Sequence, residues 1–186
     1  MHGTNETREA LLASIIEKEL AMFLATQNEE EPASGRQNPD AFRLLRWMAH
    51  AVHTDAVLAS YLEDLSQAEA AGRNFIAEKY GRLSGEIPSG ADSPHIALIA
   101  DAEAEWLEEA AAHYPVAIKS TGGVLFRRYV ACELEGLSGR TLALYAEEVQ
   151  AAREAGRNMV EERHELLCRR MGYASLAARE AALDKA

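Results

Sequence analysis

The sequence has few aromatic residues, few cysteines and no cluster of basic residues. Aromatics make up 6% of the 186 residues, while Ala, Glu, Leu and Arg are abundant, a composition that favours helices over sheets. The two cysteines, Cys132 and Cys168, lack the spacing of a metal site. Acids outnumber Lys and Arg by 30 to 19, for a formal charge of −11. Because no Lys/Arg cluster stands apart from its acids, nucleic acid and anionic membrane are excluded as partners.

Long apolar runs are also absent. Uninterrupted apolar stretches, such as IALIA, are far shorter than the roughly 20 residues that span a bilayer. The N-terminal segment MHGTNETREALLASIIEKEL has no basic region that leads into an apolar one. A cytoplasmic protein with no membrane partner and with reduced thiols is therefore expected.

Several catalytic motifs are missing as well. The sequence contains no Gly-rich phosphate loop, no Gly-x-Ser-x-Gly elbow and no Cys-x-x-Cys pair, so no cofactor is indicated. No apolar run alternates with a period of two between turn residues, which predicts that the fold has no sheet. An apolar share of 48% suffices for the core of one all-helical domain over residues 1–186.

What the sequence does contain is helical periodicity. Apolar spacing predicts helices over residues 6–27, 39–53, 55–83, 94–114, 124–135, 139–170 and 175–185. The expected N-caps are Asn38, Thr54, Ser93, Ser138 and Ser175. The segment NEEEPASGRQ, residues 28–37, is expected to be a loop because acidic residues, Pro and Gly interrupt the pattern.

The sequence repeats itself with an offset of 84 residues. Residues 42–83 align without a gap to residues 126–167, with 13 of the 42 positions identical. The repeat includes Gly-Arg-Asn, first at 72–74 and again at 156–158. Two halves, approximately 10–84 and 94–168, are therefore predicted to form a bundle of about six to seven helices. We expect them to be related by pseudo-twofold symmetry around one shared core.

Charged residues lie on the apolar stripes of the two long predicted helices. Tyr61 and Lys79 share a stripe in the first helix, and Tyr145 and Arg163 share the equivalent stripe in the second. Glu78 flanks the first stripe. Gly72 and Gly156 also fall on these stripes, which indicates close approach of a neighbouring helix.

Further polar residues share apolar stripes on the other helices. Glu19 and its counterpart Glu103 are each surrounded by Leu, Ile or Met at helical spacing, so both carboxylates are expected to point inward. Arg46, His53 and Glu133 lie on the stripes of the shorter helices. Because an isolated buried charge costs several kcal/mol, these groups must pair with each other, with a ligand or with a metal.

Three functions fit this pattern. The first is a small cytoplasmic enzyme, of specialised metabolism, that binds a polar, carboxylate-bearing metabolite between the halves. Its candidate catalytic residues are Glu19, Lys79, Glu78 and Tyr61, and its candidate ligand-binding residues are Arg46, Glu103, Glu133, Arg163, Tyr145 and His53. The second is a non-catalytic ligand-binding or interaction module, with a structural ion-pair network and a partner such as a second copy in a homodimer. The third is a carboxylate and His metal enzyme, for which the only Glu-x-x-His, at Glu161, points away from the stripe.

The chain resembles a known bacterial family. The segments ELAMF at 19–23, FRLLR at 42–46 and SYLEDLSQAEAAGRNFIAEKY at 60–80 are similar to the uncharacterised family called domain of unknown function 4125. The resemblance covers nearly the whole chain but implies no activity. Arg36 stands where the family pattern has Cys, and Val124, Leu125 and Arg127 replace its Thr, Ser and Glu, which is typical of a divergent member.

Overall fold

A computed structural model describes residues 3–26, 38–90, 93–120 and 122–185. Across these residues the fold is an all-helical bundle with no strand, as the sequence predicts. Its helices are α1 (Gly3–Ala25), α3 (Pro39–His50), α4 (Asp55–Ala70), α5 (Phe75–Ser84), α6 (Pro94–His113), α7 (Gly123–Leu134), α8 (Gly139–Glu154), α9 (Met159–Arg170) and α10 (Leu176–Leu183). Within the described part none of them is long and apolar enough to cross a membrane. The predicted loop over 28–37 lies outside the described residues.

The predicted number of helices was wrong because each predicted long helix is two helices. Both breaks occur at Gly-Arg-Asn. Gly72 has φ +67° and Gly156 has φ +65°, a left-handed conformation that ends a helix and that side chains disfavour. A Cβ atom on either glycine would meet nothing within 4 Å, so their predicted role in close helix packing was also wrong.

The Asn of the same motif begins the next helix. The side chain of Asn74 accepts hydrogen bonds from the backbone of Ile76 and Ala77, and Asn158 likewise caps α9. Each Asn also donates across to the first helix of its half, from Asn74 Nδ2 to Met22 O and from Asn158 Nδ2 to Trp106 O. The motif is therefore a corner that ends one helix, starts another and ties both to a third.

The side-chain caps of four helices are as predicted. Asn38, Thr54, Ser138 and Ser175 each accept a hydrogen bond from a backbone N–H of the first turn. Ser93 occupies the N-cap position of α6 without such a bond, and Pro94 follows it.

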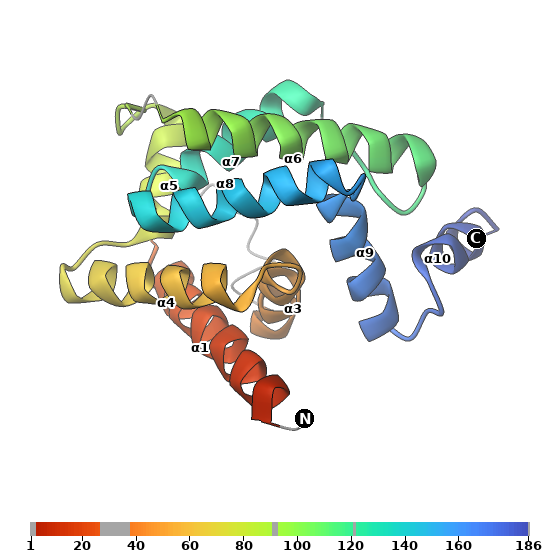
Figure 1. Ribbon diagram of the computed structural model, residues 1–186, viewed down its shortest axis with the longest axis horizontal. Helices are drawn as coiled ribbons and strands as arrows, with labels where there is room; N and C mark the ends of the chain where they lie inside the picture. Colours follow the sequence, from red (N-terminus) through yellow and green to blue (C-terminus); the bar gives the residue numbers. More distant parts are fainter. Residues whose placement is uncertain (1–2, 27–37, 91–92, 121, 186) are drawn as a thin grey trace.

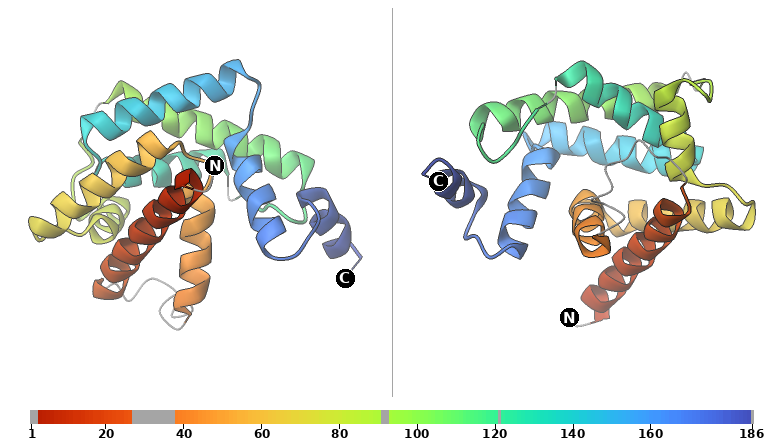
Figure 2. Two further views of the ribbon diagram at one scale, coloured as in Figure 1. Left: turned by 60° about the horizontal axis from the view of Figure 1, so that its bottom comes forward. Right: turned by 180° about the vertical axis from the view of Figure 1, so that it is seen from behind.

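The helices pack in pairs that recur after 84 residues. The first helix of each half, α1 or α6, contacts the other three helices of that half, α3, α4 and α5 or α7, α8 and α9. Between the halves, α5 packs on α7, α9 packs on α3, and α4 packs on α8 (Figures 1 and 2). The terminal helix α10 packs on α9.

The contact between α4 and α8 is reciprocal. Asp64 of α4 accepts from the backbone N–H of Ser138, at the start of α8, with an O–N distance of 3.0 Å. Glu148 of α8 accepts from the backbone N–H of Thr54, at the start of α4, at 2.6 Å. Each half thus supplies a carboxylate to the helix N-terminus of the other, where the helix dipole favours negative charge.

The buried apolar side chains do not form the single shared core that the sequence suggests. Among the described residues they form two clusters, one in each half. The first contains Leu12, Ile15, Leu58 and Leu65, and the larger second one contains Ile99, Leu142, Val149 and Met159, among others. Leu137 packs against both clusters. Polar and charged residues gather between the two clusters.

Candidate functional site

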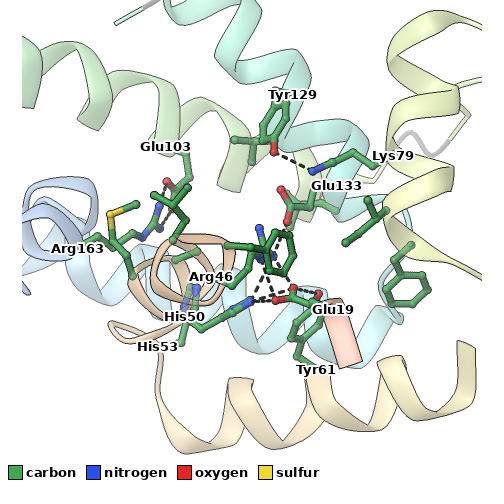
Figure 3. A pocket seen from close by; sticks show the side chains of 18 of the residues that line it. Glu19, Arg46, His50, His53, Tyr61, Lys79, Glu103, Tyr129, Glu133 and Arg163 are labelled. Atoms are coloured by element: carbon green, nitrogen blue, oxygen red, sulfur yellow. Dashed lines mark hydrogen bonds and ion pairs between the residues drawn. The ribbon is translucent and has the colours of Figure 1, made fainter. Parts of the chain in front are cut away.

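A cavity of about 750 Å³ lies between the two halves. It is lined by side chains from every helix except α10, and most of these side chains are apolar or aromatic. Its volume is within the range of pockets that hold small molecules, about 300–1,000 Å³. Figure 3 shows its polar residues in two groups, one around Glu19 and one around Glu103.

Glu19 is the centre of the first group. Its side chain, 2% exposed, accepts hydrogen bonds from Arg46 Nε at 2.8 Å and from Tyr61 Oη at 2.7 Å. Arg46 Nε bonds to Oε2, whereas Tyr61 bonds to Oε1; Arg46 Nη2 also donates to Oε1, at 2.5 Å, and His50 Nε2 lies 3.0 Å from Oε1. The carboxylate is therefore held by donors from α3 and α4.

Arg46 joins this group to a second carboxylate. Its Nη2 donates to Glu133 Oε1 at 2.8 Å, so one guanidinium bridges two acids from α1 and α7. No hydrogen bond from Arg46 Nη1 is present among the described residues. Next to Glu133, Lys79 donates to Tyr129 Oη at 2.8 Å and lies 4.5 Å from the centre of the Tyr129 ring.

The second group is centred on Glu103. Its side chain, 2% exposed, accepts from both terminal nitrogens of Arg163 and from Tyr145 Oη, the latter at 2.8 Å. In one continuous helix, 18 residues would separate Tyr145 from Arg163 by about 27 Å. The corner at Gly-Arg-Asn folds α9 back, so that Arg163 Nη2 is 3.4 Å from Tyr145 Oη.

His53 lies between the two groups, on the segment that joins α3 to α4 (Figure 3). Its Nδ1 is 2.6 Å from Glu148 Oε2, and the two side chains are 7% and 8% exposed. The Tyr145 ring meets the imidazole edge to face with centroids 4.5 Å apart, and the His50 ring is 6.3 Å away. A chain of rings thus connects the two carboxylate groups.

The electrostatics fix the protonation of the buried acids. Burial opposes ionisation of Glu19 and Glu103, but Arg46 and Arg163 outweigh it and hold both pKa values below the ordinary range. Burial likewise opposes ionisation of Glu133, and Arg46 and Lys79 lower its pKa to about 2. All three are carboxylates at neutral pH.

The pKa values of two tyrosines and one histidine shift in the direction that favours the neutral form of each group. Burial, followed by the adjacent Glu carboxylates, raises the pKa of Tyr61 and of Tyr145 well above the ordinary value, so both hydroxyls keep their protons and donate them. Burial lowers the pKa of His53, although Glu148 acts against it. His53 is therefore neutral at pH 7.

The structure brings most of the predicted site residues together. Those that line the cavity are Glu19, Arg46, His53, Tyr61, Lys79, Glu103, Glu133, Tyr145 and Arg163. The predicted inward orientation of Glu19 and Glu103 is confirmed by their burial. Glu78 does not line the cavity, because its carboxylate pairs with Arg73 and Arg82.

The sequence interpretation left three residues of the site unassigned. His50 follows Arg46 by four residues on the same face of α3, and Tyr129 precedes Glu133 by four residues on α7. This spacing of four residues could have identified His50 and Tyr129 as site residues from the sequence. Glu148 contacts His53, which is 95 residues away, so no local spacing could reveal the pair.

A metal centre receives little support from the arrangement of side chains. Within the described ranges, no three His, Cys, Asp or Glu side chains come together in a way that could hold a metal ion. The buried carboxylates are instead occupied by guanidinium groups and hydroxyls.

Comparison with known families gives one match. The family described as "Protein of unknown function (DUF4125)" matches residues 9–181, nearly the whole chain. The chain belongs to this family. No curated protein and no solved structure matches the chain.

Three of the departures from the DUF4125 pattern fall on the outside of the molecule. Val124 and Leu125, at the start of α7, are 83% and 65% exposed. Arg127 pairs with Asp101 on the surface, where both side chains are nearly half exposed. Arg36, at the position of the family's Cys, lies outside the described residues. None of the described departures changes a residue that lines the cavity.

Proposed function

We propose that this protein binds a small anionic molecule, with an apolar body and at least one carboxylate, in the cavity between its halves. One observation carries the proposal: the charge of the cavity is opposite to that of the chain. Among the described residues, the lining has four cations, Arg46, Lys79, Lys119 and Arg163, and three carboxylates, Glu19, Glu103 and Glu133, in a chain with a formal charge of −11. An anion balances this excess, and apolar walls suit a carbon skeleton.

Arg46 supports the anion assignment in a specific way. It pairs with Glu19 through Nε and Nη2, an arrangement that holds the guanidinium plane fixed. Its Nη1, which makes no hydrogen bond within the described residues, can then donate to a ligand carboxylate without loss of an internal contact. Arg163, by contrast, gives both terminal nitrogens to Glu103, which favours a structural role.

The position of the cavity supports a relation between the repeat and binding. We infer that the two halves are related by a pseudo-twofold axis through the contact of α4 and α8. The reciprocal bonds from Asp64 and Glu148 and the recurring helix pairs support this axis. Binding pockets often form at such interfaces between structural repeats or domains. On this view the duplication created the cavity, and the later differences between the halves made it specific.

A titration with 3-nitrobenzoate and with its methyl ester tests the proposal. The probe has an aromatic body and one carboxylate, and the ester removes the charge. We expect the acid to bind at least tenfold more tightly than the ester, as measured by calorimetry. Equal affinities would contradict the anion assignment.

Two variants place the binding event in the cavity. Ala49 lines the cavity on α3, and Ala49→Phe fills part of it without removal of a polar group. Ala59 is an exposed residue of α4, and Ala59→Phe is the matched control. We expect Ala49→Phe to abolish binding of 3-nitrobenzoate and Ala59→Phe to leave it unchanged. Equal binding by both variants would place the ligand elsewhere.

A further inference from the structure

The contact of His53 with Glu148 has the form of a carboxylate-oriented imidazole. Nδ1 is 2.6 Å from a carboxylate that also accepts from the backbone N–H of Thr54. An ionised carboxylate can only accept, so Nδ1 carries the proton of the neutral ring. The other nitrogen, Nε2, makes no hydrogen bond within the described part of the chain, and His53 lines the cavity. The imidazole therefore presents an unprotonated nitrogen as a base.

A second histidine shows what the carboxylate adds. His164 also lines the cavity, and its Nδ1 is 2.9 Å from the carbonyl oxygen of Val160, which fixes the same tautomer. A carbonyl is neutral, whereas the Glu148 carboxylate gains in attraction when the adjacent ring becomes a cation. Of these two bases, His53 is the better placed to take up a proton.

The surroundings of His53 decide whether an imidazolium is tolerated. The charged and titratable groups near it come from five helices: Arg8 of α1, which donates to the backbone carbonyl of His53, His50 of α3, Glu103 of α6, Tyr145 and Glu148 of α8, and Arg163 of α9. The charge of Arg163 opposes an imidazolium at His53, and its two bonds to Glu103 counter this effect in part. Glu148 then remains as the charge in direct contact with the ring.

From this geometry we propose that His53 is a general base that takes a proton from a weakly acidic hydroxyl, of phenol or enol type, on the molecule bound in the cavity. The O–H bond breaks, its proton moves to His53 Nε2, and the electron pair stays on the ligand oxygen. Total charge in the cavity is unchanged, because the ring gains the positive charge that balances the new oxyanion. Glu148 is the positioning residue: it holds the tautomer and stabilises the imidazolium.

The inference rests on the proposed function, since the base acts on a bound anion. No Ser or Cys is present among the described lining residues, and the Thr141 hydroxyl is engaged by Ser60 at 2.7 Å. Proton transfer is therefore the chemistry that this set of side chains supports, in preference to a covalent acyl step.

The test uses 4-hydroxy-3-nitrobenzoate, which is 3-nitrobenzoate with a ring hydroxyl that becomes coloured when it ionises. Nitrogen NMR of the 15N-labelled full chain reports the protonation of each histidine. Without the probe, at a pH below the pKa of its hydroxyl, we expect His53 to be neutral with the proton on Nδ1. With the probe bound, the phenolate absorbance should appear together with an imidazolium signal for His53, while His164 stays neutral.

Two substitutions isolate the roles. His53→Asn keeps an N–H donor near the position of Nδ1 but removes the base, and we expect it to bind the probe with at least a tenfold smaller fraction of phenolate. Glu148→Gln removes the charge and should move the proton of His53 to Nε2. The nitrogen chemical shifts of His53 report this move, which is not expected if the contact is purely structural. Loss of the imidazolium signal with retained 3-nitrobenzoate binding is the expected result for this variant.

The outcomes are separable. If neither probe binds, the proposed function fails and this inference with it. If 3-nitrobenzoate binds but His53 stays neutral beside the bound hydroxyl probe, only the general base is overturned. A proton on Nε2 of His53 in the free protein would overturn it as well.

Discussion

The two buried carboxylates occupy equivalent positions in the repeat but have different surroundings. Glu19 and Glu103 each accept from a tyrosine 42 residues further along the chain, at 2.7 and 2.8 Å. Glu103 takes its cation from α9 of its own half, as Arg163. The residue equivalent to Arg163 is Lys79, which donates to Tyr129 instead. Glu19 takes its cation, Arg46, from α3.

Apart from Tyr61, the partners of Glu19 have no polar counterparts in the second half. The positions equivalent to Arg46 and His50 are Val130 and Leu134, and the position equivalent to Glu133 is Ala49. The Glu103 group is thus a closed pair with a tyrosine, whereas the Glu19 group is an open network with several acids and bases. A duplicated unit can keep one copy for stability while the other acquires a binding role.

The largest expected effect comes from removal of the cation of each group. Arg163→Met leaves a buried carboxylate with only the tyrosine hydroxyl, and we expect a loss of about 3–5 kcal/mol in the free energy of unfolding. Arg46→Met should cost less, about 1–3 kcal/mol, because Tyr61 and His50 still contact Glu19. Denaturant unfolding at pH 7 measures both.

A double variant controls for the packing of the lost side chain. Glu103→Gln combined with Arg163→Met removes both charges, so it should recover most of the stability lost in Arg163→Met alone. Equal losses for the two arginine variants would show that the two groups have the same energetic role, and would contradict the difference between the Glu19 group and the Glu103 group.

The second effect is a pH dependence at Glu133, in the first group. Glu133 has a pKa lowered from 4.5 to about 2, because Arg46 and Lys79 outweigh its burial. A lowered acid pKa stabilises the folded state above about pH 4.5, and this stabilisation is lost as the pH falls toward 2. We expect Glu133→Gln to be less stable by about 1 kcal/mol at pH 7, since its side chain is 32% exposed and solvent screens the pair.

The measurement is the free energy of unfolding of Glu133→Gln and of the unmodified protein between pH 7 and pH 2. The difference between them should shrink as the pH falls from about 4.5 toward 2, where about half of the Glu133 side chains are protonated in the folded state. A difference that stays constant with pH would mean that the carboxylate charge contributes nothing.

These tests depend on a site that the sequence predicted only in part. The inward side chains followed from helical periodicity, because a helix face places residues three and four apart on one side. Glu19, Glu103 and Arg46 were found in this way. The partners could not be found, since periodicity says which face is buried but not which helix it meets. The contact of His53 with Glu148 needs the packing of the two halves.

The helix breaks show a different limit. Gly-Arg-Asn lies within an uninterrupted apolar stripe, so the periodicity predicted one helix through it. The signal for the helix break was the repeated Gly, which takes the left-handed conformation, followed two residues later by Asn, which caps the next helix. Because the stripes of α4 and α5 happen to stay in phase across the corner, the pattern hid the break.

An effect of similar size is expected at the Asn of the two corners, where the halves should behave alike. Asn74→Ala and Asn158→Ala each remove an N-cap and a hydrogen bond to the first helix of the half. We expect each to lower the free energy of unfolding by about 1–2 kcal/mol. Thermal and denaturant unfolding provide the measurement, and a loss in only one variant would show that the corners are not equivalent.

The smallest effect is expected at the Arg of the same motif. Arg73 and Arg157 each form a bidentate pair with a Glu five residues later, Glu78 and Glu162. Both arginine side chains are nearly half exposed, and exposed ion pairs contribute about 0–1 kcal/mol because water and salt screen them. Arg73→Met and Arg157→Met should therefore change the free energy of unfolding by less than about 0.5 kcal/mol each.

Gly72→Ala, one residue away, is the contrast: its positive φ predicts a loss of about 1 kcal/mol. A larger loss for the arginine variants than for Gly72→Ala would mean that the ion pairs, and not the backbone conformation, form the corner.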